Sequence, residues 1–69
     1  MKYQWESCFL KMVEGTFETD APLTMTQMKR RAKKEAGLSG SRGVWVERDG
    51  SALFRTTVAS YTTLLVRPI

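Results

Sequence analysis

Residues 44–55 decide the fold of this chain, and they read VWVERDGSALFR. Two runs of β-branched, aromatic and aliphatic residues flank the dipeptide Asp49-Gly50. An Asp-Gly dipeptide between such runs is a strong signal for a two-residue β-hairpin turn. The stretch therefore predicts an antiparallel hairpin, whose facing apolar and aromatic side chains stabilise the strand pair. The pairs set opposite each other are Val46 with Leu53 and Trp45 with Phe54.

A third β-prone run follows the hairpin at residues 61–66 and reads YTTLLV. A short turn at Ala59 and Ser60 would return this run antiparallel to the second strand of the hairpin. We therefore expect a three-stranded meander. The expected pairs are Phe54 with Leu65 and Leu53 with Val66. In this register one face carries Trp45, Phe54 and Leu65, and the other carries Val44, Val46, Leu53, Leu64 and Val66.

A capped helix is predicted over residues 25–36. Thr24 is a preferred N-cap residue, and Gln27 three positions later completes a capping box. Gly37 stands where a residue of left-handed conformation ends a helix. Apolar side chains recur at helical spacing at Met25, Met28, Ala32 and Ala36. This stripe predicts the side of the helix that packs on the sheet.

The N-terminal segment, residues 2–14, admits two interpretations. Trp5, Cys8, Phe9, Met12 and Val13 recur at helical spacing. Apolar residues also recur at a period of two, which is the spacing of a strand. Aromatic and β-branched residues are common in this segment and favour β structure, so we prefer the strand over the helix. The side chains of that alternating set are Tyr3, Trp5, Phe9, Val13 and Phe17. We expect one long strand with a bulge near Lys11 or an end that leaves the sheet.

These elements predict an α+β fold in a single domain, residues 1–69, with one basic helix packed on a mainly antiparallel sheet in the order β-α-β-β-β. Both faces of the predicted sheet are partly apolar, and one short helix covers only one of them. The second face is therefore expected to meet the first strand, a partner protein or a second copy in a homodimer.

The composition argues against an enzyme. The chain has no histidine and one cysteine, so the usual His-based catalytic sites and zinc sites have no ligands, and we expect no cofactor and no metal. Cys8 is expected to be a buried apolar residue. No run is long and apolar enough for a membrane span, and no signal peptide is evident, so we expect a cytoplasmic protein.

Positive charge is concentrated on the predicted helix. The formal net charge is +4, from 11 Lys and Arg against 7 Asp and Glu. The candidate binding residues are Lys29, Arg30, Arg31, Lys33 and Lys34 on the helix and Arg42 in the connection that follows. Like-charged residues four apart repel each other, so the crowding favours a surface for an external anion, such as phosphate or an acidic protein patch. The alternative is an ordinary solvated face.

The layout of a β-type start, one capped helix with a lysine and arginine face, and a β-meander in about 70 residues resembles small phage-encoded anti-CRISPR proteins that block type I surveillance complexes. The resemblance implies a stoichiometric inhibitor of a CRISPR effector, with a basic face that can also engage DNA. It carries over the five helix cations only as a surface of similar character.

Three hypotheses follow for the function. The first is a small phage or mobile-element protein that inhibits a host nucleoprotein machine by occupying its surface with the basic helix. The second is a DNA- or RNA-binding regulator, for which contacts between most of the five cations and duplex phosphates predict a log-log salt slope of about −3 to −5. The third is a structural or assembly subunit that dimerises through the second sheet face.

Overall fold

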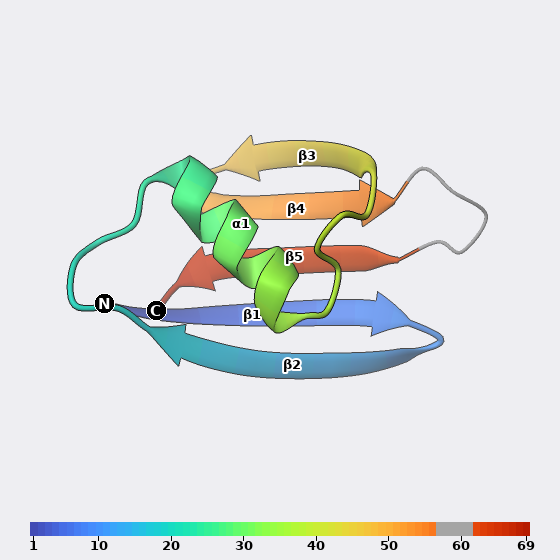
Figure 1. Cartoon of the computed structure of the whole chain (residues 1–69), viewed down its shortest axis with the longest axis horizontal. Helices are drawn as coiled ribbons and strands as arrows, with labels where there is room; N and C mark the ends of the chain where they lie inside the picture. The colour runs from blue at the N-terminus through green and yellow to red at the C-terminus, as the bar shows by residue number, and fades with distance from the viewer. Residues whose placement is uncertain (57–61) are drawn as a thin grey trace.

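The computed structural model of the chain describes residues 1–56 and 62–69. Within these residues, one helix lies across one face of a five-stranded antiparallel sheet, the α+β arrangement expected from the sequence (Figure 1). The elements are β1 (Lys2–Phe9), β2 (Lys11–Glu18), α1 (Met25–Glu35), β3 (Gly43–Arg48), β4 (Ser51–Thr56) and β5 (Thr63–Pro68). Their order across the sheet is β2-β1-β5-β4-β3, so the N-terminal hairpin pairs with the C-terminal strand.

The N-terminal segment forms two strands instead of one, so the element order is β-β-α-β-β-β and the expected β-α-β-β-β is wrong by one strand. The chain reverses at Leu10, whose φ is +67°, between the paired Phe9 and Lys11. The preference for β structure over helix is confirmed, whereas the bulge near Lys11 is wrong because the chain turns back there. A positive φ is uncommon for leucine, and no glycine or turn dipeptide marks this position.

Helix α1 begins and ends at the predicted signals. The Thr24 hydroxyl accepts a hydrogen bond from the Gln27 N–H at 3.2 Å, and the Gln27 side-chain oxygen accepts one from the Thr24 N–H at 2.9 Å. At the other end, Gly37 has a φ of +74° and the Leu38 N–H donates to the carbonyl of Lys33 at 2.7 Å. Local capping at both ends therefore sets the length of the helix.

The β3–β4 hairpin has the predicted register, with Val46 opposite Leu53 and Trp45 opposite Phe54. Asp49 and Gly50 both have positive φ, as a type I′ turn requires. The register of β5 differs by one residue from the prediction. The observed pairs are Phe54 with Leu64 and Leu53 with Leu65. The turn expected at Ala59 and Ser60 lies outside the described residues.

A one-residue slip moves every side chain of a strand to the other face. Leu64 and Val66 therefore face α1 and are fully buried, whereas Leu65 is half-buried on the opposite face. The prediction failed because residues 64–66 are apolar at consecutive positions, so their own pattern does not show which alternate set faces the core. Packing of Leu64 and Val66 beneath the helix decides the register.

The core lies between α1 and the sheet. Its buried apolar side chains are Tyr3, Trp5, Phe17, Met28, Ala32, Ala52, Phe54, Leu64 and Val66. Met28 and Ala32 are the helix residues that reach it, and both belong to the predicted stripe. Trp5 lies across Gly15 on the neighbouring strand, where an added Cβ would come within 2.7 Å of the indole. The absence of a side chain at Gly15 therefore leaves the space that the Trp5 ring occupies.

Candidate functional site

Helix α1 places its cations in three positions relative to the sheet. Met28 and Ala32 point into the core, so the side chains next to them in sequence project along the two sides of the helix, close to the sheet. Only the side chains on the arc of the helix opposite Met28 and Ala32 face outward. Lys29 and Lys33 lie on the flank toward β3 and β4, and Arg31 lies on the opposite flank, beside Phe17 of β2. The five cations therefore do not form one uniform exposed face.

Lys29 is engaged within the chain. Its ammonium group forms an ion pair with the carboxylate of Glu47 on β3 and lies 5.5 Å from the ring centroid of Trp45. The Lys29 side chain is only 19% exposed. Lys29 therefore already has a partner within the chain, because the aliphatic stem of a lysine can cover apolar surface while its ammonium group pairs with a carboxylate.

Lys33 and Arg31 are also engaged. Lys33 donates a 2.6 Å hydrogen bond to the carbonyl of Ser41 and lies 4.6 Å from the ring centroid of Phe54. It thereby ties the connection after the helix to the helix itself. Arg31 donates to Glu35 at 3.0 Å and its guanidinium lies 5.0 Å from the centroid of the Phe17 ring. Each of these cations is half-buried and contributes to packing on its own flank.

Arg30 and Lys34 remain on the outward arc, and we call them the outer cations. Both are exposed, lie four residues apart, and have no ion pair or side-chain hydrogen bond to any other described residue. A shallow hollow of about 240 Å³ lies beside them, lined by Gln27, Arg30, Arg31 and Lys34. This pair is the part of the predicted basic face that the structure leaves open to an external anion.

Arg42 adds a third exposed cation near the end of α1. It directly follows Ser41, whose carbonyl is held by Lys33 in the last turn of the helix. Within the described residues Arg42 itself has no hydrogen bond or ion pair from its side chain. The structure thus anchors its backbone beside the helix and leaves its guanidinium group available.

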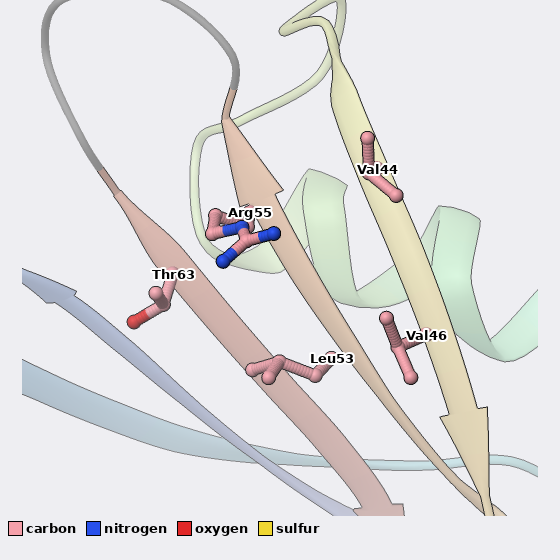
Figure 2. A pocket seen from close by; sticks show the side chains of 5 residues that line it. All are labelled: Val44, Val46, Leu53, Arg55 and Thr63. Carbon is pink, nitrogen blue, oxygen red and sulfur yellow. The ribbon is translucent and has the colours of Figure 1, made fainter.

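A second candidate surface lies on the sheet face opposite α1, which we call the open sheet face. Figure 2 views it with the helix behind the sheet. It contains a hollow of about 170 Å³ lined by Val44, Val46, Leu53, Arg55 and Thr63. Val44, Val46 and Leu53 are 51%, 58% and 41% exposed. The sequence placed these three apolar residues on the second face correctly, but its one-residue error in β5 placed Leu64 and Val66 there in place of Leu65.

Cys8 differs from its prediction, because it is exposed and not buried. It lies near the end of β1 on the open sheet face, opposite Met12. In the described ranges no three His, Cys, Asp or Glu side chains are grouped so that they could hold a metal ion. The described part of the chain also has no helix with the length and apolar character needed to cross a membrane.

Comparisons with protein-family models, with curated proteins and with solved structures find no match for this chain.

Proposed function

We propose that this protein is a small, non-enzymatic binding protein that inhibits a host nucleoprotein machine by docking the outer cations of α1 and Arg42 on an anionic surface. The specific form of this proposal is a phage-encoded inhibitor of a type I CRISPR effector, which rests on the resemblance of layout and charge. The observation that carries the general proposal is the exposed Arg30–Lys34 pair, which has no intramolecular partner among the described residues.

Electrostatics favours an anionic partner at this place. Arg30 and Lys34 repel each other across one turn of the helix, and an external anion between them removes that repulsion. Lys33 and Lys34 lie in the last turn of α1, where the partial negative charge of the helix C-terminus offsets part of the repulsion between the cations without attracting an anion itself. Arg42 extends the positive surface beyond the helix end. The other three helix cations support this surface by holding the helix to β3, to β2 and to its following connection.

The test compares two triple variants of equal charge. The test variant is Arg30→Gln/Lys34→Gln/Arg42→Gln. The control variant is Lys2→Gln/Lys11→Gln/Arg48→Gln, which removes three exposed cations away from the helix. Each lowers the formal net charge from +4 by three, so a difference between them reports the position of the charges and not their total.

The tagged wild-type chain and both variants are used for affinity capture from bacterial lysate, with and without nuclease treatment. We expect the wild type and the control variant to recover the same protein or nucleoprotein complex, and the test variant to bind it at least about tenfold more weakly. Failure of the wild type to recover any complex would count against the proposal. Equal recovery by the test variant would show that another surface binds.

Direct nucleic-acid binding is the other outcome that this test separates. If Arg30, Lys34 and Arg42 contact duplex phosphates, the log-log slope of affinity against salt should be about −2 to −3. This is shallower than the slope expected for five free cations, because Lys29, Arg31 and Lys33 are engaged within the chain. A flat salt dependence, or no shift of duplex DNA, excludes the DNA-binding regulator and leaves a protein surface as the partner.

A further inference from the structure

The strand registers arrange the open sheet face in rows that run across the sheet. One row contains, from β2 to β3, Glu14, Glu6, Leu65, Leu53 and Val46. The next row contains Met12, Cys8, Thr63, Arg55 and Val44 in the same strand order. A third row contains Thr16, Gln4 and Arg67, and Arg48 lies on the same face at the end of β3. In the first two rows the face is acidic on the β1–β2 side and apolar in the middle and on the β3 side, with Arg55 among the apolar residues.

Among the described residues, Glu6, Glu14 and Arg55 on this face have no ion-pair partner, whereas Arg67 on the same face donates a hydrogen bond to Gln4 at 3.0 Å. Glu6 and Glu14 lie directly opposite each other on paired strands, and like charges in that position repel. Figure 2 shows Arg55 lying over the sheet beside Thr63, above the apolar hollow. An occupant of this face should therefore supply a carboxylate for Arg55 and a cation for the two glutamates.

A second copy of the chain supplies both. Arg55 on β4 and Glu6 on β1 are two strands apart, so with strands spaced about 4.8 Å and alternate residues about 6.8 Å apart their Cα atoms are roughly 12 Å from each other. Consider two copies with their open sheet faces against each other, related by a two-fold axis that lies in the plane of the interface and passes midway between Arg55 and Glu6. This axis places Arg55 of one copy over the Glu6 position of the other. Each Arg55 then lies over the partner's Glu6 and Glu14, and each Leu53 lies over the partner's Leu65. One rotation thus pairs Arg55 with Glu6 and Glu14 and covers the apolar centre.

The area of the face is sufficient for such a contact. Five strands at about 4.8 Å spacing, each about 20 Å long, give a face of roughly 500 Å² per copy. Two copies bury roughly 1,000 Å², which is at the lower limit for a specific interface. The expected dimer is therefore concentration-dependent and not obligate.

We propose that a second copy of this chain covers the open sheet face and forms a two-fold symmetric dimer. Arg55 of each copy pairs with the partner's Glu6 and Glu14, and Leu53 and Leu65 form the apolar centre of the interface. This inference does not depend on the proposed function, because α1 and its outer cations lie on the other side of the sheet (Figure 1).

Sedimentation velocity on the full chain, from about 10 µM to about 1 mM, tests the proposal over the range where weak dimers form. We expect the wild type to change from monomer to dimer as concentration rises. Two charge-reversed variants, Arg55→Glu and Glu6→Arg/Glu14→Arg, should each weaken dimerisation at least about tenfold, because each homodimer then brings like charges together. The substituted side chains are exposed or half-buried, and circular dichroism checks that the fold is kept.

Mixing the two variants in equal amounts is the decisive measurement. In the mixed dimer, residue 55 of each copy again lies opposite side chains of the other sign at positions 6 and 14. The mixture should therefore dimerise in the same concentration range as the wild type, although neither variant alone does. The control is Lys34→Glu, a charge reversal on the helix side, which should leave the dimer unchanged. A wild type that stays monomeric to about 1 mM overturns the proposal. The proposal is also overturned if both variants dimerise as strongly as the wild type, because the copies would then meet through another surface. It is overturned as well if the mixture does not dimerise, because the contact would then not depend on these charge pairs.

Discussion

Replacing Leu64 and Leu65 by alanine, one at a time, separates the two faces of β5. Leu64 is 0% exposed and lies in the core, whereas Leu65 is half-buried on the open sheet face. Truncating a core leucine costs about 2–5 kcal/mol, because lost burial is compounded by a cavity. Truncating Leu65, which is more than half buried, removes most of the value of full burial but leaves a smaller cavity, at a cost of roughly 1–2 kcal/mol. We therefore expect Leu64→Ala to be the more destabilising by at least about 1 kcal/mol.

Urea unfolding at low micromolar concentration, followed by tryptophan fluorescence and circular dichroism, measures this difference in the monomer. A chain of 69 residues has about 3–10 kcal/mol of total stability, so Leu64→Ala can unfold it entirely. The milder pair Leu64→Val and Leu65→Val then provides the comparison, with an expected cost of about 0.5–1.5 kcal/mol for the buried position and less for the other. If the two positions cost the same, or Leu65 costs more, the register described for β5 is wrong.

Three other experiments each test one contact. Gly43→Ala should destabilise the fold, because a Cβ at Gly43 would overlap the carbonyl oxygen of Arg55. The expected fall in Tm is about 4–8 °C for each kcal/mol lost, and a thermal scan with unchanged Tm would contradict this close approach. Gly37→Ala should cost about 1 kcal/mol in urea unfolding, because an L-residue is strained at the φ of +74°, and no loss would argue against the left-handed cap. A double-mutant cycle with Lys29→Gln and Glu47→Gln should give about 0.2–1 kcal/mol of coupling that declines as salt is added, whereas zero coupling at low salt would show that the ion pair does not contribute.

Much of the fold could be predicted from short segments. The helix was placed correctly because Thr24, Gln27 and Gly37 each make their stabilising contact within four residues of their own position. The β3–β4 hairpin was placed correctly because a two-residue turn leaves one register for its strands. The N-terminal hairpin was missed because its turn at Leu10 lacks the residues that usually mark a reversal.

The candidate site was predicted less well than the fold. Helical spacing placed the cations on α1 correctly, but spacing alone implies that every side chain on the arc away from Met28 is exposed to solvent. The neighbouring strands reach that arc from both sides, so Lys29 meets Glu47 and Lys33 meets Phe54 on one flank, and Arg31 meets Phe17 on the other. Substituting these two lysines is therefore expected to cost stability as well as charge, and Arg30 and Lys34 are the cleaner positions for a binding test. No local pattern in the sequence singles out Arg55, since its place beside the apolar hollow depends on the pairing of three strands.

The elements whose stability comes from near neighbours follow from local sequence signals: the capped helix, the type I′ turn at Asp49 and Gly50, and the β character of the remaining segments. Three features follow from contacts between residues far apart in the chain, which no local signal encodes: the shift of β5 against β4, the place of β1 beside β5, and which cations have no partner among the described residues. Burial of Leu64 and Val66 under the helix decides between registers that are locally equivalent.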